Sequence, residues 1–270
     1  MASVRPAAIA GTFYPGNRDE LARGVQAMLA AARSAAAPSP KAIIAPHAGY
    51  IYSGPIAASI YALIAPLRAR VKRVVLLGPA HRVAFHGIAL PGVDAFATPL
   101  GTVNIDSEAV KQLARLPFVG ASKEAHRLEH SLEVQVPFLQ TVLDTFTLVP
   151  MAVGRATAQQ VATVLELLWG GDETLIVISS DMSHYLPYSQ AQATDNATAQ
   201  AILDLRTDIN HHQACGATPV IGLNLVAQKR GLKPQLIDLR NSGDTAGDKA
   251  RVVGYASFAF YENEHTSPAH

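Results

Sequence analysis

Short apolar runs alternate with longer stretches of helical periodicity along most of the chain. The runs are rich in β-branched residues and predict strands at 42–45, 73–77, 148–153, 174–178, 235–239 and 252–260. The stretches between them predict helices at 55–65, 107–116, 132–143, 156–169, 189–205 and 219–229. Strands that are almost wholly apolar belong in a sheet covered on both faces. The pattern therefore predicts an α/β fold, a three-layer α/β/α sandwich whose central sheet is mostly parallel or mixed.

Three of the predicted helices begin at residues that are typical of helix starts. Ser53 stands before Gly54-Pro55 and predicts a helix start there, because the missing amide proton of proline is harmless in a first turn. Asp106 and Thr157 are predicted to cap the next two helices, since their side chains can accept a hydrogen bond from a free backbone amide.

The chain is predicted to be a single domain over residues 1–270. The one linker-like stretch, at 35–40, lies too close to the N-terminus to separate two units that each fold alone. Residues 262–270 are predicted to form a disordered tail, as chain ends without apolar anchors commonly do.

Charge and composition exclude several classes of protein. Lys and Arg total 22 against 21 Asp and Glu, a net charge of +1 without a dense basic block, which argues against nucleic-acid binding. Charged residues make up only 16%, below the ~25% typical of soluble chains, so a large interior or a homo-oligomer interface is expected. No apolar run approaches the ~20 residues of a membrane helix or resembles a secretory signal, which predicts a cytoplasmic protein.

Three of the predicted strands end in a turn that presents a histidine. His47 follows the first strand, His81 the second, and His184 the fourth, with Asp181 just before it. Because the carboxyl ends of parallel strands share one edge of a sheet, and ligands bind there, these side chains are expected to converge. A lone loop histidine is more often a structural hydrogen-bonding group, but three at equivalent strand ends favour a site.

Histidine and aspartate side chains that converge in this way are best suited to binding a metal ion. The strand at 235–239 should bring Asp244 to the same edge, and two imidazoles with one carboxylate form an arrangement typical of non-haem Fe(II). We therefore predict His47, His81 and Asp244 as metal ligands, with Fe(II) favoured and copper or zinc as alternatives. His184 is predicted to act as acid or base, with Asp181 as its orienting partner or as a supporting group near the metal.

Other polar residues are expected around this cleft. Tyr50 and Tyr52 follow the His47 loop and are predicted to line a pocket, with simple packing as the alternative. His130 and Glu133 are predicted to border the cleft. The segment 126–130 also matches the zinc-peptidase pattern H-x-x-E-H, which we disfavour because it precedes a predicted helix rather than lying within one.

Segments spread over nearly the whole chain resemble the Memo family, whose bacterial and archaeal members are also called AmmeMemoRadiSam system protein B. The resemblance is carried by Arg5-Pro6-Ala7, Ala10 to Pro15, Pro46 to Gly54, Leu77 to His81, Glu129 to Glu133 and Ser179 to His184. It implies a fold like that of the class III extradiol dioxygenases (LigB-like) and a metal site at His47 and His81, with Asp181 and His184 close by. It also implies a functional association with a radical SAM protein and an AMMECR-type protein.

The chain departs from the family pattern at one place. The resemblance implies a cysteine as third metal ligand in the segment corresponding to 242–245, where this chain has none. Either Asp244 replaces it, or two histidines and water hold the metal. The only cysteine, Cys215, is interpreted as a helix-packing residue.

Three functions remain open on these grounds. The first is a metal-dependent oxidoreductase, or dioxygenase-like enzyme, acting on a small substrate. The second is a non-catalytic, metal-dependent binding or scaffold protein. The third is a zinc-dependent hydrolase. The residues predict the fold and the metal site more directly than they predict catalytic turnover.

Overall fold

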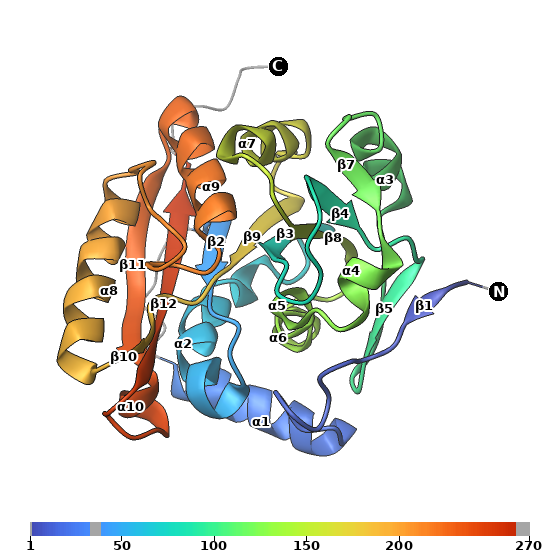
Figure 1. The fold of residues 1–270 in the computed structure, drawn as a ribbon. Helices are drawn as coiled ribbons and strands as arrows, with labels where there is room; N and C mark the ends of the chain where they lie inside the picture. Colours follow the sequence, from blue (N-terminus) through green and yellow to red (C-terminus); the bar gives the residue numbers. More distant parts are fainter. Residues whose placement is uncertain (1, 33–38, 263–270) are drawn as a thin grey trace.

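A mixed β-sheet runs through the middle of the computed structural model, which describes residues 2–32 and 39–262 (Figure 1). Its strands are β2 (Ala42–Ala45), β3 (Arg73–Pro79), β4 (Ile88–Leu90), β7 (Val119–Ala121), β8 (Thr147–Val153), β9 (Thr174–Ser179), β10 (His184–Leu186), β11 (Lys233–Asn241) and β12 (Val252–Tyr261). Their order is β10-β12-β2-β9-β3-β8-β4-β7, and β11 pairs with the other side of β12. A small sheet contains β1 (Val4–Arg5), β5 (Ala95–Thr98) and β6 (Gly101–Asn104).

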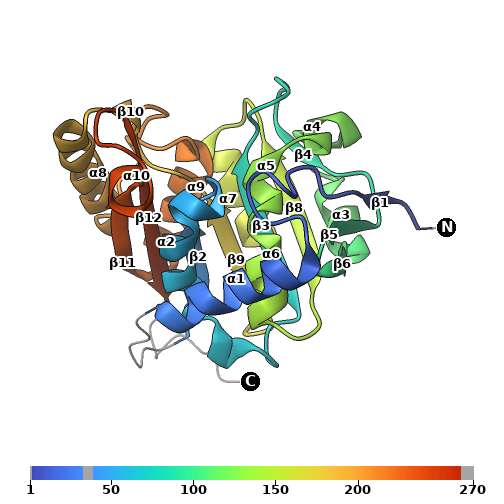
Figure 2. The same ribbon diagram turned by 90° about the horizontal axis from the view of Figure 1, so that it is seen from below.

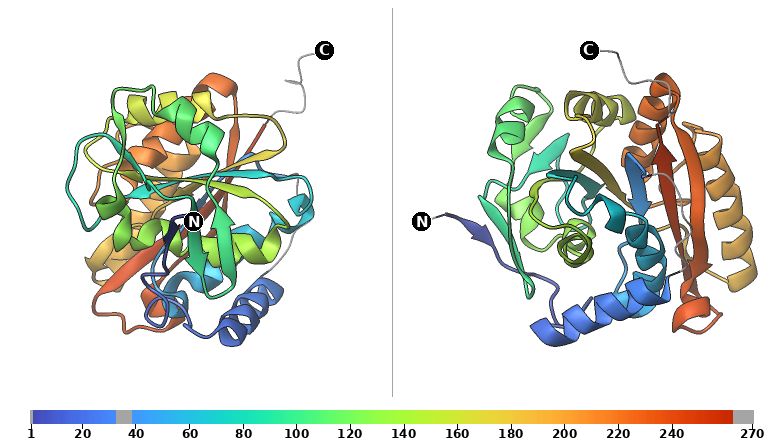
Figure 3. Two further views of the ribbon diagram at one scale, coloured as in Figure 1. Left: turned by 90° about the vertical axis from the view of Figure 1, so that its right-hand side faces the viewer. Right: turned by 180° about the vertical axis from the view of Figure 1, so that it is seen from behind.

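Helices cover both faces of the large sheet. They are α1 (Arg18–Ala31), α2 (Tyr50–Ala62), α3 (Ser107–Leu113), α4 (Lys123–Arg127), α5 (His130–Glu133), α6 (Val136–Val142), α7 (Ala158–Leu167), α8 (Tyr188–Leu203), α9 (Ala217–Arg230) and α10 (Ser242–Thr245). Figure 2 shows α1 lying across α2 and α6, and Figure 3 shows α8 outside β11 and β12. None of the helices in the described part of the chain is both long and apolar enough to cross a membrane.

The central strands β2, β9, β3 and β8 are parallel neighbours. β12 joins this group antiparallel at β2, and β4 joins it antiparallel at β8. Every predicted strand is confirmed, and so is the mixed character of the sheet. The parallel arrangement places the carboxyl ends of four strands along one edge, which is where ligands bind in folds of this kind.

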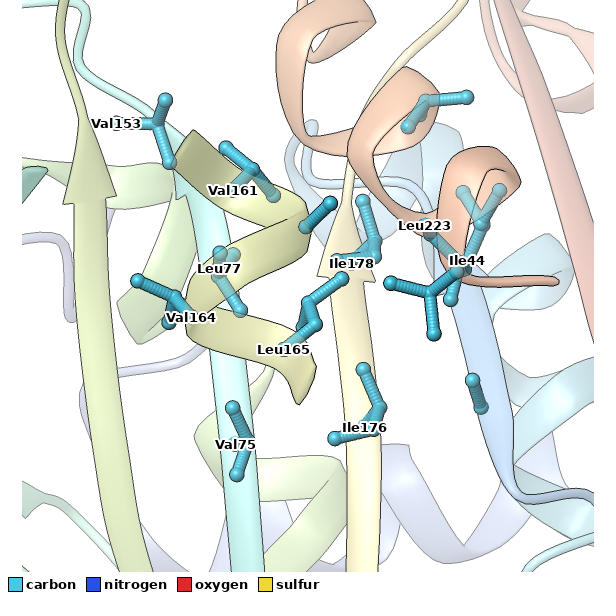
Figure 4. Close-up of a cluster of buried hydrophobic side chains, with 14 of the residues drawn as sticks. Ile44, Val75, Leu77, Val153, Val161, Val164, Leu165, Ile176, Ile178 and Leu223 are labelled. Atoms are coloured by element: carbon cyan, nitrogen blue, oxygen red, sulfur yellow. The ribbon is translucent and has the colours of Figure 1, made fainter. Parts of the chain in front are cut away.

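Successive residues of the central strands enter two separate cores. On one face, Ile44, Val75 and Ile176 pack beneath α7 and α9, as Figure 4 shows. On the other face, Ile43 and Val74 pack with α1, α2 and α6. This division follows from the alternation of side chains along a strand, and it gives the predicted three-layer α/β/α arrangement.

Some local predictions were wrong. Helix α2 begins at Tyr50, not near Pro55, because the amide of Ser53 already bonds to the carbonyl of Gly49 at 3.1 Å and Pro55 lies inside the helix. The predicted helix at 132–143 is divided into α5 and α6. Helix α1 was not predicted, because it buries only Leu21 and Val25 and so carries a weak apolar pattern.

The predicted caps and tail have different outcomes. Asp106 and Thr157 accept hydrogen bonds from the first turns of α3 and α7, so both cap predictions are confirmed. Of the predicted tail, Glu262 is described, and its carboxylate accepts a hydrogen bond from the Trp169 indole at 2.9 Å. Residues 263–270 lie outside the described residues.

Candidate metal centre

The carboxyl ends of β2 and β3 bring two histidines together. His47 follows β2, His81 follows β3, and their ring centroids are 5.2 Å apart. β9 lies between β2 and β3 in the sheet, and Asp181 follows its end. His47, His81 and Asp181 therefore lie at one edge of the sheet, as expected.

A third histidine completes the cluster. His130, the first residue of α5, has its ring centroid 4.5 Å from that of His81 and 5.4 Å from that of His47. The nitrogens that the three rings offer all lie within 4.8 Å of one another. A tetrahedral ion with bonds of about 2.1 Å needs separations of about 3.4 Å, which small ring rotations can supply.

Close packing of α5 on β3 explains the position of His130. The Ser131 hydroxyl donates to the carbonyl of Pro79 at 2.8 Å. A Cβ atom at Gly78 would lie 2.8 Å from the Ser131 oxygen, so only glycine permits this approach. The short helix thereby holds His130 against the end of the strand that carries His81.

Hydrogen bonding leaves one nitrogen of His47 free for a ligand. The Ser179 hydroxyl donates to the carbonyl of Ser131 at 2.6 Å, so its proton is already used. Its oxygen lies 2.9 Å from Nδ1 of His47 and must accept from that nitrogen. Nδ1 of His47 therefore carries the proton, and Nε2 presents its lone pair.

A buried carboxylate holds His81 in the same way. Glu129 Oε1 lies 2.9 Å from Nδ1 of His81, and Oε2 accepts from the His81 amide at 2.5 Å. Burial alone would raise the pKa of Glu129, but the hydrogen bonds and charge of His81 and the Ser131 amide lower it to about 2. A carboxylate on the outer nitrogen of a histidine is a common support for a metal ligand. Nε2 of His81 is left for an ion.

His130 carries an unsatisfied buried nitrogen. Its Nδ1 is buried without a hydrogen-bond partner among the described residues, and the nearest carboxylate oxygen, of Glu129, is 3.5 Å away. Burial, followed by the neighbouring His81, lowers the pKa of His130 to about 4. Burial and the surrounding histidines also hold the pKa of His47 well below its usual value. Neutral imidazole is the form that binds a metal ion.

Cys215 contacts one histidine of this cluster, a contact that its interpretation as a helix-packing residue did not include. Its sulfur lies 3.2 Å from Nε2 of His47 and accepts from the Asp181 amide at 3.3 Å. Burial raises the pKa of this thiol to about 12, and the charge of Asp181 adds to the effect. A bound metal ion would oppose that shift, because it favours the thiolate. Cys215 is thus the cysteine that lies beside His47 in this structure, whereas the segment 242–245 has none.

The structure does not bring Asp244 to the histidines. Asp244 lies in α10 after β11, and β12 separates β11 from β2. Its Oδ2 accepts from the Asn241 amide at 2.9 Å, and its Oδ1 accepts from the Tyr188 hydroxyl at 2.6 Å. The edge of the sheet was correctly anticipated, but two strand spacings of ~4.8 Å keep this carboxylate away.

Asp181 and His184 lie beside the cluster. Asp181 Oδ1 accepts from the His47 amide at 2.6 Å, so this carboxylate supports the ligand loop directly. Burial raises the pKa of Asp181 to about 7, against the opposing hydrogen bond from His47. His184 is half-buried, its pKa is lowered by burial, and its charge acts on His47. The acid or base role of His184 stays a prediction.

The remaining predicted pocket residues have mainly structural contacts. The buried Tyr50 donates to the carbonyl of Val134 at 2.7 Å and packs against Phe138, while Tyr52 is partly exposed on α2. The carboxylate of Glu133 pairs with Arg5 at 2.5 Å and thereby fixes the N-terminal segment. Tyr50 also lines a cavity of about 440 Å³, but His47 is not among the described residues that line that cavity.

The zinc-peptidase pattern at 126–130 does not form a shared ligand face. His126 belongs to α4 and His130 to α5, with a break at Leu128. The Nε2 atom of His126 is committed to the carbonyl of Ala89 at 2.7 Å. The two histidines therefore do not have the one-turn helical spacing that the pattern requires.

The fold and this cluster define an α/β protein with a histidine-rich candidate metal centre at the carboxyl edge of its sheet. The family model described as "Memo-like protein" matches residues 5–259. A MEMO1 family protein of Aquifex aeolicus (strain VF5) is 37% identical over 269 residues, covering 95% of this chain and 99% of the relative. One of Archaeoglobus fulgidus is 34% identical, with 95% and 99% covered. The chain belongs to the Memo family.

Proposed function

We propose that this protein binds a divalent transition metal ion through His47 and His81, with His130 and Cys215 supplying the remaining donors. The observation that carries the proposal is the hydrogen bonding of the two strand-end histidines. Ser179 and Glu129 each bind a Nδ1 atom at 2.9 Å, so both Nε2 atoms are directed away from these partners and can serve as metal ligands. The Cys215 sulfur lies 3.2 Å from one of them, close to the ~3.6 Å expected for nitrogen and sulfur on one tetrahedral ion.

Fe(II) is our first choice of metal, with copper and zinc as alternatives. Imidazole suits all three metals, whereas a thiolate ligand shifts the preference toward the softer ones. In an enzyme, the ion would supply redox or Lewis-acid chemistry. Glu129 and Ser179 would orient the ligands, Asp181 would hold the His47 loop, and His184 would exchange a proton with a small substrate. The dioxygenase-like reaction is the form of this proposal that the family resemblance suggests.

A non-catalytic metal-binding role is the second candidate. The observation that favours it is burial, since His47 is only 2% exposed and the thiol lies directly beside it. Several protein donors around one ion retain a metal well but leave few positions for a substrate. Zinc-dependent hydrolysis would use the same ligands, and it needs an open position for water.

Metal analysis of untagged protein purified without oxygen tests the proposal. We expect near-stoichiometric metal in the native protein and loss of that metal in His47→Ala and His81→Ala. His212→Ala is the matched control, because His212 is exposed and is not one of the clustered histidines. Absence of every transition metal from the native protein, or full retention by both variants, would refute metal binding at this site.

Oxygen consumption separates the catalytic proposal from the binding proposal. Iron-loaded protein should consume oxygen with catechol-like compounds, and His184→Ala should abolish that consumption while retaining the iron. Stoichiometric metal without any turnover would support the binding role. We further propose a functional association with a radical SAM protein and an AMMECR-type protein, which affinity capture with this chain as bait would test.

A further inference from the structure

A cavity of about 370 Å³ opens beside the metal cluster. The residues that line it include His81, Cys215, Arg155 and His211. Arg155 follows β8, the parallel neighbour of β3, so it occupies the same sheet edge as His81. Cavities of ~300–1,000 Å³ are the usual size for small-molecule sites.

Backbone hydrogen bonds build the wall that carries Arg155. The loop after His81 is held against the end of β8, because the Ala80 amide donates to Val153 at 2.9 Å and the Arg155 amide donates to Phe85 at 2.8 Å. A Cβ atom at Gly154 would lie 2.5 Å from the Phe85 carbonyl oxygen, so glycine is required for this approach. The position of Arg155 relative to the metal cluster is thus fixed by main-chain contacts.

The charged residue in the cavity wall is positive. Among the described residues that line it there is no carboxylate, and Arg155 is the one permanently charged cation. In the described part of the chain, the exposed Arg155 side chain has no hydrogen bond or ion pair, so its guanidinium is available to a ligand in the cavity that it lines. Val83 and Phe85 supply apolar surface in the same cavity. An arginine without a partner, beside an apolar wall, suits a ligand that has an anionic end and an apolar body.

We propose that this cavity binds a small organic anion, with its carboxylate or phosphate group on Arg155 and its apolar part against Phe85. The guanidinium can accept either group through two parallel hydrogen bonds. Bound in this way, the ligand would lie next to His81 and Cys215 and would be the substrate of the proposed metal site. That last step rests on the proposed function, whereas the anion site itself does not.

Calorimetric titration with three related probes tests the inference. Benzoate and phenyl phosphate carry the two anionic groups, and benzamide is the uncharged control. We expect at least one anion to bind ~10-fold or more tightly than benzamide, as is typical of a charge-assisted pair. The tighter of the two anions identifies the ligand class as carboxylate or phosphate.

Variants of Arg155 locate the effect. Arg155→Met should abolish the preference for the anion and leave benzamide binding unchanged, and Arg155→Lys should restore part of it, because the charge returns without the paired hydrogen bonds. Arg127→Met is the matched control, since Arg127 is exposed and paired with Glu124 outside the cavity. Equal binding of all three probes, or an anion preference that survives in Arg155→Met, would overturn the inference.

The same titrations on metal-free protein distinguish this inference from the proposed function. Anion binding that depends on Arg155 and persists after the metal is removed supports the anion site by itself. Protein that contains metal but shows no dependence on Arg155 keeps the metal site and refutes the anion site.

Discussion

Replacing Glu129 by Gln tests how this carboxylate supports His81, the proposed metal ligand. The buried Glu129 carboxylate accepts three hydrogen bonds, from Nδ1 of His81 at 2.9 Å, from the His81 amide at 2.5 Å and from the Ser131 amide at 3.0 Å. Glutamine has one acceptor oxygen, so its NH₂ group must face a donor of His81 or Ser131. The ring of His81 then loses the hydrogen bond that orients it.

The expected loss in metal affinity is 10- to 100-fold, which is the usual effect of removing such a supporting carboxylate and corresponds to about 1.4–2.7 kcal/mol. Competition with a chelator of known affinity measures it, using Zn²⁺ or Co²⁺ on protein first stripped of metal. Glu124→Gln is the control, because Glu124 is an exposed carboxylate paired with Arg127. Unchanged affinity in a folded Glu129→Gln protein would show that His81 is not a ligand or needs no such support.

Three further predictions address the thiol, the N-terminal segment and pH. Cys215→Ser should weaken metal binding and remove the thiolate-to-metal absorption band of Co²⁺-loaded protein; an unchanged spectrum would exclude the sulfur as a ligand. Glu133→Ala should destabilise the fold by about 3–5 kcal/mol, because it leaves the buried Arg5 charge without its partner, and urea unfolding measures the loss. Burial lowers the pKa of His126 from 6.5 to about 4. As the pH falls between these two values, His126 is protonated in the unfolded chain but stays neutral in the folded protein, which favours unfolding. Stability of metal-free protein should therefore fall by up to about 3 kcal/mol between pH 6.5 and 4, and His126→Gln should remove that part of the pH dependence; an identical pH profile would refute the assignment.

Most of the sheet could be predicted because its information is local. Runs such as 73–77 and 174–178 are apolar without alternation, and only a sheet covered on both faces buries such strands completely. The same reasoning placed His47 and His81 at one edge, because the direction of parallel strands determines where their ends lie. Short elements such as β4 and α4 were missed, since few residues carry little periodicity.

The sequence by itself determined the layered fold, the two strand-end histidines and the edge at which they meet, because strand direction and apolar periodicity are properties of short segments. Only the tertiary structure showed which other side chains lie beside these two histidines. His130 begins a short helix and Cys215 precedes α9, so neither follows a strand, and the Cys215 sulfur reaches His47 across 168 positions of the chain. Asp244 follows a strand as anticipated, yet an intervening strand lies between that strand and β2. Contacts of this kind depend on how segments distant in the sequence pack together, and local sequence patterns carry no information about that packing.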